Sequence, residues 1–254
     1  ESGRFAVGWG DAARRMGCEV EILKGDLRRA VRPAEVGARL RADAGGKIKA
    51  ILVAQIDTAS GVVNDIPAIA KAIRAAGHEA LLMVDTVASL ACMPFEMDAW
   101  GVDVAMSGSQ KGLMTPPGLS FVAASPRARK RHETADLRTP YWDWTAREGK
   151  EHYTKYAGTP PEHLMFALRQ ALDIIAAEGL DTVFRRHALL AEAETAADPH
   201  RIAEIHTRLA DIEAHSAPAR AAAILSGLGF SSADQLRPCA EFSGGWRMRV
   251  ALAA

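Results

Sequence analysis

The sequence has few cysteines, no net charge and no long hydrophobic run. Its three cysteines, Cys18, Cys92 and Cys239, lie far apart, which excludes a disulfide framework and zinc-ligand spacing and is typical of a reducing compartment. Basic and acidic residues each number 31, so bulk charge does not favour nucleic acid or an anionic membrane. No apolar run could span a bilayer, and no signal peptide is present. We therefore expect a cytoplasmic protein without a membrane partner.

The 254 residues are 48% hydrophobic and 24% charged, which is typical of a globular protein with a substantial core. This length suits one large domain or two ordinary ones. The first residue is Glu1, and the last residues, VALAA, lie inside an apolar helical pattern. We therefore expect a piece of a longer protein.

The first 125 residues alternate strand-like and helix-like runs. Nearly continuous apolar runs predict strands that are buried on both faces. Helical patterns between them indicate crossover connections and a mostly parallel sheet, the α/β class, with helices on both faces. The expected strands are 18–23, 48–54, 80–84, 103–107 and 119–123, and the expected helices lie near 4–17, 33–44 and 65–77.

The rest of the chain differs from this α/β part. Residues 126–158 are polar and irregular, with an aromatic cluster YWDW at 141–144 that we expect to pack near a subunit interface. The basic run 126–138 predicts a solvated helix face rather than a nucleic-acid surface. From 160 onward the pattern is helical, and residues 189–254 are rich in alanine and contain no lysine. This composition predicts an all-α tail.

One lysine stands in the stretch SGSQKGLMTPPG, 107–118, just after an expected strand. Asp85 closes the preceding strand, and ligands of open α/β sheets collect at the carboxyl ends of strands. Pyridoxal phosphate chemistry needs a lysine for the Schiff base and a carboxylate for the pyridine nitrogen. The serines and glycines before Lys111 suit close approach and phosphate contact. Spacing alone leaves open that Lys111 is an ordinary loop residue.

Three motifs resemble the class V aminotransferases, specifically the alanine–glyoxylate and serine–glyoxylate group. They are VDTVASL, MDAWGVDVAMSGSQKGL and the TPPG that follows. The resemblance covers about 1–188 and implies the incomplete large domain of a fold-type I pyridoxal-phosphate enzyme, with no nucleic-acid partner. It implies transamination between a small amino acid, serine or alanine, and a 2-oxo acid such as glyoxylate or pyruvate.

The resemblance also implies roles for individual residues. Lys111 resembles the Schiff-base lysine, which also moves the proton between the substrate and the cofactor. Asp85 resembles the partner of the pyridinium nitrogen, with Val87 against the ring. Gln110 resembles the neighbour of the lysine that positions the cofactor. Thr58, in QIDTASGV, would supply the hydroxyl that contacts the ring oxygen.

The segment KYAGTPPEHLMFALRQAL, 155–172, resembles the family's dimer-crossing segment. Tyr156 and Thr159 would then reach the cofactor phosphate of the partner subunit, which implies a homodimer with a shared active site. The family's glycine-rich phosphate segment and its C-terminal small domain do not occur in this sequence. We therefore expect impaired activity of this chain.

Residues 189–254 resemble a different family, the ATP-binding proteins of the ABC-F class. The resemblance rests on a helical stretch and on the segment EFSGGWRMRVALAA. It implies that Ser243, Gly244 and Gly245 belong to a signature motif that contacts ATP in the parent protein. A Walker A loop and a Walker B carboxylate are missing, so we do not expect ATP hydrolysis. A chimera joined near 187–194 is the interpretation that fits both resemblances.

Three functions stay open from the sequence. The first is a truncated aminotransferase, the second an ABC-F ATP-binding fragment, and the third an inactive hybrid of the two. No metal site is expected, because the histidines of the tail lack metal-ligand spacing.

Overall fold

A computed structural model of the chain describes residues 1–139, 141–195, 202, 204, 205, 207, 230, 231, 233–237 and 241. The chain divides into two compact units. Unit 1 comprises Glu1–Ser89, Phe95–Ser107 and Ser120–Glu162, and unit 2 comprises Leu90–Pro94, Gly108–Leu119 and His163–Ala254.

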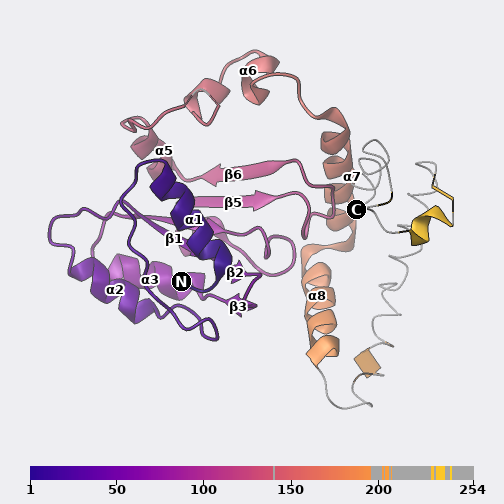
Figure 1. Cartoon of the computed structure of the whole chain (residues 1–254), viewed down its shortest axis with the longest axis horizontal. Helices are drawn as coiled ribbons and strands as arrows, with labels where there is room; N and C mark the ends of the chain where they lie inside the picture. Colours follow the sequence, from indigo (N-terminus) through magenta and orange to yellow (C-terminus); the bar gives the residue numbers. More distant parts are fainter. Residues whose placement is uncertain are drawn as a thin grey trace. The chain divides into compact units, whose positions relative to one another are not determined.

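A four-stranded sheet forms the centre of the α/β part (Figure 1). Its order is β1-β4-β5-β6, and β4 runs parallel to both β1 and β5. β6 runs in the opposite direction to β5 (Figure 1). This arrangement confirms the predicted mostly parallel sheet. The strands are β1 (Ala50–Ala54), β4 (Leu81–Asp85), β5 (Val104–Gly108) and β6 (Ser120–Ala124).

A small antiparallel pair, β2 (Ile56–Asp57) and β3 (Val62–Val63), follows β1 directly. The sequence pattern did not predict it, since two-residue strands carry no periodicity. The pair turns the chain back at residues 58–61, so that Asn64 N donates to Gln55 O over 2.8 Å.

The core of unit 1 lies between the sheet and two helices that pack against each other, α2 (Pro33–Arg41) and α3 (Ile66–Ala75). Its members come mainly from α2, β1, α3 and β4, with Val102 just before β5, and burial of such side chains stabilises the fold by about 1.5–3 kcal/mol each. The largest contributors are Val36, Leu40, Val53, Ile66, Ile69, Ile73, Leu82, Val84 and Val102.

Local signals set the ends of α3 as expected. The Asp65 carboxylate accepts a hydrogen bond from Ala68 N over 2.9 Å and caps the first turn, where Pro67 also lies. Gly77 follows the helix with φ of 62°, a left-handed conformation that glycine adopts without strain. α1 (Arg4–Arg15) begins the chain.

The expected strand at 18–23 is wrong, because this segment is irregular. Its carbonyl groups have partners other than a strand. Val20 O accepts a bond from the Arg14 side chain over 3.1 Å, and Leu23 O accepts one from the amino group of Glu1 over 2.6 Å. The alternating apolar pattern is present in the sequence, but these bonds to Arg14 and Glu1 take the place of a strand ladder.

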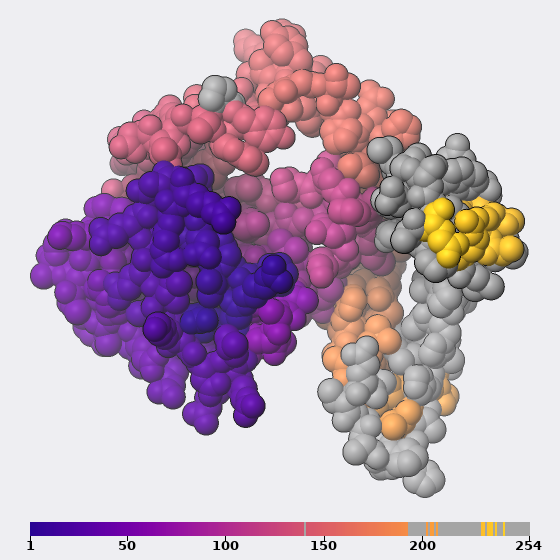
Figure 2. Space-filling view, viewed as in Figure 1, coloured from indigo at the N-terminus to yellow at the C-terminus, as the bar shows by residue number. Residues whose placement is uncertain are grey.

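The segment after β6 contains short helices and exposed aromatic side chains. They are α5 (Pro126–His132), the 3-10 turn Thr145–Arg147 and α6 (His152–Tyr156), and α4 (Met97–Trp100) lies earlier in the same unit. Tyr141 and Trp142 are 58% and 70% exposed and contact each other edge to face. Their side chains therefore contribute to the surface of this segment (salmon in Figure 2) and not to a core. A place at a subunit interface stays a prediction.

Unit 2 contains two long helices, α7 (Glu162–Glu178) and α8 (Leu180–Thr195). Gly179, with φ of 82°, separates them as predicted. α8 continues across the expected boundary at 188. Ser243, Gly244 and Gly245, which the sequence predicted to form a signature motif, lie outside the described residues, as does most of the predicted helical tail. Among the described helices, none is long and apolar enough to cross a membrane.

Candidate active site

Asp85 is the last residue of β4, where the carboxyl ends of the parallel strands meet. It pairs with Ala54 of β1 and Met106 of β5, and its carbonyl accepts a bond from Gln55 N over 2.9 Å. The backbone is thus fixed on both sides. The side chain projects from the edge where ligands of open α/β sheets bind.

The Asp85 carboxylate is half-buried and only partly satisfied. Its Oδ1 accepts a bond from Val87 N over 2.8 Å, and within the described residues Oδ2 has no hydrogen-bond partner. Burial raises the pKa of Asp85, the Val87 bond opposes this, and the charge of Asp57 adds to it. A cationic N–H donor at Oδ2 would stabilise the ionised form, because it would offset the cost of burial.

Asp57 holds the turn that presents Thr58. Its carboxylate is fully buried and accepts bonds from Ala6 N over 3.0 Å and Ala59 N over 3.1 Å. A side chain on Gly3 would collide with this carboxylate, so the start of α1 must come close to it. Thr58 itself is exposed between β2 and β3. The sequence pattern did not predict this role of Asp57, because its partner Ala6 lies 51 positions earlier in the chain.

Lys111 lies in a tightly bonded loop of unit 2. Ser109 Oγ donates to Pro116 O over 2.7 Å, and Thr115 Oγ1 donates to Ser109 O over 2.8 Å. Lys111 O accepts a bond from Met114 N over 2.8 Å, while its side chain is exposed. The loop therefore fixes the lysine backbone and leaves the amine accessible.

The expected contact of the loop serines with a phosphate is not favoured by this geometry. Ser109 is completely buried, and its hydroxyl is used within the loop. Ser107 is buried too and points toward Thr86 O at 3.5 Å. Both hydroxyls satisfy backbone carbonyls, so they shape the loop instead of facing a ligand.

The other predicted site residues are Val87, Gln110, Tyr156 and Thr159. Val87 is half-buried beside Asp85, and Gln110 is exposed before the lysine. Tyr156 ends α6 and Thr159 follows it, both exposed. Among the described residues, no hydrogen bond or ring contact joins Tyr156 or Thr159 to the others. Asp85 and Lys111 belong to different units, so the structure describes each half of the predicted site separately.

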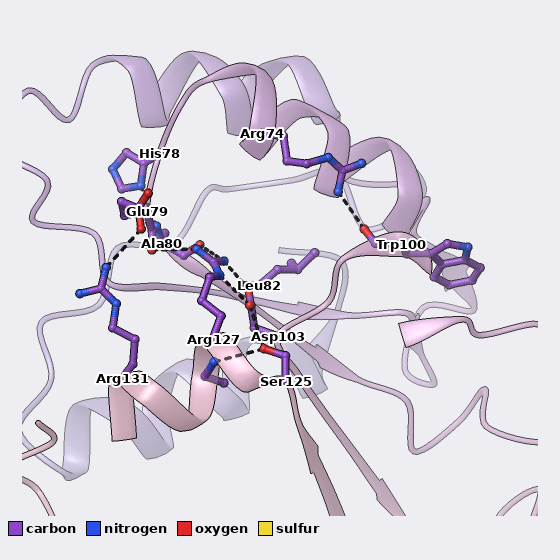
Figure 3. A network of polar contacts seen from close by, with 11 residues as sticks. Arg74, His78, Glu79, Ala80, Leu82, Trp100, Asp103, Ser125, Arg127 and Arg131 are labelled. Carbon is purple, nitrogen blue, oxygen red and sulfur yellow. Dashed lines mark hydrogen bonds and ion pairs between the residues drawn. The ribbon is translucent and has the colours of Figure 1, made fainter. Parts of the chain in front are cut away.

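A cavity of about 640 Å³ in unit 1 does not coincide with these residues. It lies near the amino ends of β4 and β5, beside Leu82 and Asp103, whereas Asp85 lies at the carboxyl end. Figure 3 shows the Asp103 carboxylate there, bonded to Arg127, Ser125 and Leu82 N. The basic run 126–138 was predicted to be a solvated helix face. Arg127 differs from this expectation, because it forms an ion pair with the buried carboxylate of Asp103.

The side chains present fit a pyridoxal-type cofactor. Asp85 offers an open carboxylate oxygen at the sheet edge, and Lys111 offers an accessible primary amine. The described residues contain no cluster of three or more histidine, cysteine or acidic side chains that could hold a metal ion. Each group by itself thus has the chemistry that such a cofactor requires, the carboxylate for a cationic ring nitrogen and the amine for an aldehyde.

Comparison with known proteins places most of the chain in one group. Residues 5–212 match the family described as aminotransferase class-V. A serine–glyoxylate aminotransferase of Methylorubrum extorquens is 41% identical over 196 residues, which is 75% of this chain and 49% of that protein. An L-aspartate–glyoxylate aminotransferase of Paracoccus denitrificans is 40% identical over 198 residues, 77% of this chain and 50% of that protein.

The fold has a solved counterpart. The crystal structure of an alanine–glyoxylate aminotransferase from Nostoc sp. superposes with a TM-score of 0.69 at 29% identity, covering 76% of this chain and 51% of that one. The chain thus spans about half the length of the relatives it matches. The family match continues past residue 188, and none of these findings supports the predicted ABC-F resemblance of 189–254.

Proposed function

Because the chain belongs to the class V aminotransferases, we propose that it forms the cofactor-binding part of a pyridoxal-phosphate transaminase. The amino donor would be a small amino acid, serine or alanine, and the acceptor a 2-oxo acid such as glyoxylate or pyruvate. The relatives' names support glyoxylate as acceptor, and they include serine, alanine and aspartate donors. The open oxygen of Asp85 at the sheet edge is the structural observation that carries the proposal.

Pyridoxal phosphate, when bound, supplies an aldehyde and an electron-withdrawing ring. Asp85 would accept the ring N–H at Oδ2 and hold the proton there, while Val87 N keeps Oδ1 in place. Val87 would lie against the ring. Thr58, presented by the buried Asp57, would donate its hydroxyl to the ring oxygen. These contacts orient the ring before any chemistry occurs.

Lys111 would bind the cofactor covalently through Nζ and then act as the general base and acid. Its accessible side chain supports this role. The freed amine would take the α-proton of the amino acid and deliver it to the aldehyde carbon of the cofactor within the same half-reaction, so that Nζ is neutral again when that half ends. Gln110, the residue before it, would position the cofactor.

We also propose a homodimer with a shared site. Tyr156 and Thr159 are exposed and, among the described residues, form no hydrogen bond with Asp85 or Thr58. In a dimer they would be available to the cofactor phosphate of the partner subunit. Because the chain spans about half of its relatives, dimerisation and full activity of this chain stay proposals. The cytoplasmic location expected from the cysteine content stays a prediction too.

The ABC-F resemblance of residues 189–254, with the motif of Ser243, Gly244 and Gly245, also stays a prediction, as does an inactive hybrid. Binding of an ATP analogue that is lost in Gly244→Asp would support the resemblance. Unchanged binding in that variant, or none in the parent chain, would remove it.

The proposal is tested by covalent labelling. Purified chain is incubated with pyridoxal phosphate, treated with borohydride and mapped by peptide mass spectrometry. We expect an absorbance band and a reduced adduct on Lys111, both lost in Lys111→Ala. Lys71→Ala is the matched control, because Lys71 is an exposed lysine on α3 in unit 1. A parent chain without the adduct on Lys111, or with equal labelling in Lys111→Ala, contradicts the proposal.

A further inference from the structure

Two segments of unit 2 contact each other directly beside Lys111. One is Leu90–Pro94, and the other is the loop Gly108–Leu119. Gly112, the residue after the lysine, is buried against the first segment. A Cβ built on Gly112 would collide with Leu90 O and would lie 2.7 Å from Cys92 Sγ. The contact therefore requires glycine, and its closest partner is a backbone atom that cannot rotate away.

Both segments contain a strained residue. Ala91 has φ of 62° and is buried at 7% exposure, and Met114 has φ of 54°. A residue with a side chain adopts this left-handed conformation only where its surroundings enforce it, and such strain gathers at functional sites. Ala91 lies between the two residues that contact Gly112, so its conformation directs Leu90 O and Cys92 toward the lysine loop.

The Cys92 thiol lies in this contact and feels the charge of Lys111. It is half-buried, and burial raises its pKa, while the positive charges of Arg186 and Lys111 oppose this shift. The raised pKa predicts a slowly reacting thiol. Cys92 can therefore report on the contact without any cofactor.

We propose that Leu90–Pro94 is a positioning segment for Lys111. It holds the backbone at Gly112 and thereby sets the direction from which the lysine amine reaches the cofactor. This role rests on the proposed function, since it assumes that Lys111 binds the cofactor. An alanine at 112 must push Leu90 O away or move the lysine backbone, and a displacement of about 1 Å at a reacting group can cost about 100-fold.

The test compares Gly112→Ala with Gly8→Ala in the full chain. Gly8 is a fair control, because a Cβ there meets nothing within 4 Å. Two rates are measured, pyridoxal-phosphate labelling of Lys111 under borohydride and reaction of Cys92 with an aromatic disulfide in the absence of cofactor. In Gly112→Ala we expect labelling at least 10-fold slower and the thiol several-fold faster, with Gly8→Ala equal to the parent. Parental labelling in a folded Gly112→Ala overturns the proposal.

Two more variants separate positioning from simple stability. Ala91→Gly relieves the strain and loosens the segment, so we expect an unchanged or higher melting temperature with labelling several-fold slower. In Gly112→Ala with Cys92→Gly, the lost sulfur gives the segment room to move, and labelling should partly recover. If Gly112→Ala does not fold, the test rests on Ala91→Gly. A labelling rate in Ala91→Gly equal to that of the parent chain would then contradict the positioning role.

Failure of the two proposals looks different. A parent chain that is not labelled on Lys111 removes the proposed function and this role with it. A labelled parent with parental rates in Gly112→Ala and Ala91→Gly removes only the role of Leu90–Pro94.

Discussion

Two aspartates of unit 1 lie at opposite ends of neighbouring strands and have opposite environments. Asp103, just before β5, is buried at 4% exposure and accepts bonds from Leu82 N over 2.8 Å, Ser125 Oγ over 3.2 Å and Arg127 Nε over 2.8 Å. Asp85, at the end of β4, has one bond at Oδ1. The saturated carboxylate joins parts of the fold, and the unsaturated one has capacity left for a ligand. A cavity beside Asp103 therefore locates the site less well than the open oxygen of Asp85.

The largest expected effect concerns the open carboxylate. In Asp85→Asn, the amide oxygen can still accept from Val87 N, but the charge that would hold a cationic ring nitrogen is gone. We expect the dissociation constant of pyridoxal phosphate, measured by absorbance titration, to rise about 100-fold, because a charge-assisted hydrogen bond contributes about 3 kcal/mol. Asp65→Asn is the matched control on α3, and an equal loss in it would contradict a specific role for Asp85.

The saturated carboxylate should give a stability effect instead. Arg127→Met keeps much of the side-chain volume and leaves the Asp103 charge buried without its cation. Breaking a fully buried pair costs about 3–5 kcal/mol, and partial exposure of Arg127 lowers this to about 2 kcal/mol. Denaturant unfolding measures the loss. Arg131→Met, which removes an exposed ion pair with Glu79, should cost less than about 0.5 kcal/mol.

The pH dependence of stability should show what burial of the open carboxylate of Asp85 costs. Burial raises the pKa of Asp85, so the folded chain binds a proton there more tightly than the unfolded chain. The ionised carboxylate therefore costs stability, and this cost grows as pH rises from about 4, the ordinary pKa, through the raised pKa. Without cofactor, Asp85→Asn should melt at a higher temperature than the parent at pH 7 and at the same temperature below pH 4. A lower melting temperature at pH 7 would contradict this sign.

The sheet and its edge were predictable because their signals are local. The apolar runs at 48–54 and 80–84 became β1 and β4, and an aspartate at a strand end marks the edge by its position alone. The segment 18–23 alternates apolar and acidic residues, which also predicts a strand, but it is irregular, and its carbonyls bond to Arg14 and to the N-terminal amine. No sequence period encodes such partners.

Contacts across the chain were not predictable either. The Asp57 carboxylate accepts a bond from Ala6 N, which lies 51 positions earlier in the chain. The residues around Asp57 in the sequence do not indicate that its side chain is buried. The left-handed conformation of Ala91 is even harder to predict from the sequence, because positive φ is usual for glycine and not for alanine. Asp57 lies within QIDTASGV and Ala91 directly follows VDTVASL, yet neither motif indicates the packing role of these residues. A sequence motif predicts which residues form the site, but it does not predict the long-range contacts that hold them in place.

The smallest expected effect comes from a third carboxylate, which is neither saturated in the core nor open to a ligand. Asp65 is exposed and caps α3 through one bond to Ala68 N. Asp65→Ala should lower the free energy of unfolding by about 1 kcal/mol, whereas Asp65→Ser, which keeps a capping oxygen, should cost only a few tenths. Neither variant should change labelling of Lys111. A labelling defect in Asp65→Ala that is absent from Asp65→Ser would mean that the α3 cap affects the cofactor site. The number of hydrogen bonds on a carboxylate would then be a poor guide to which aspartate binds the cofactor.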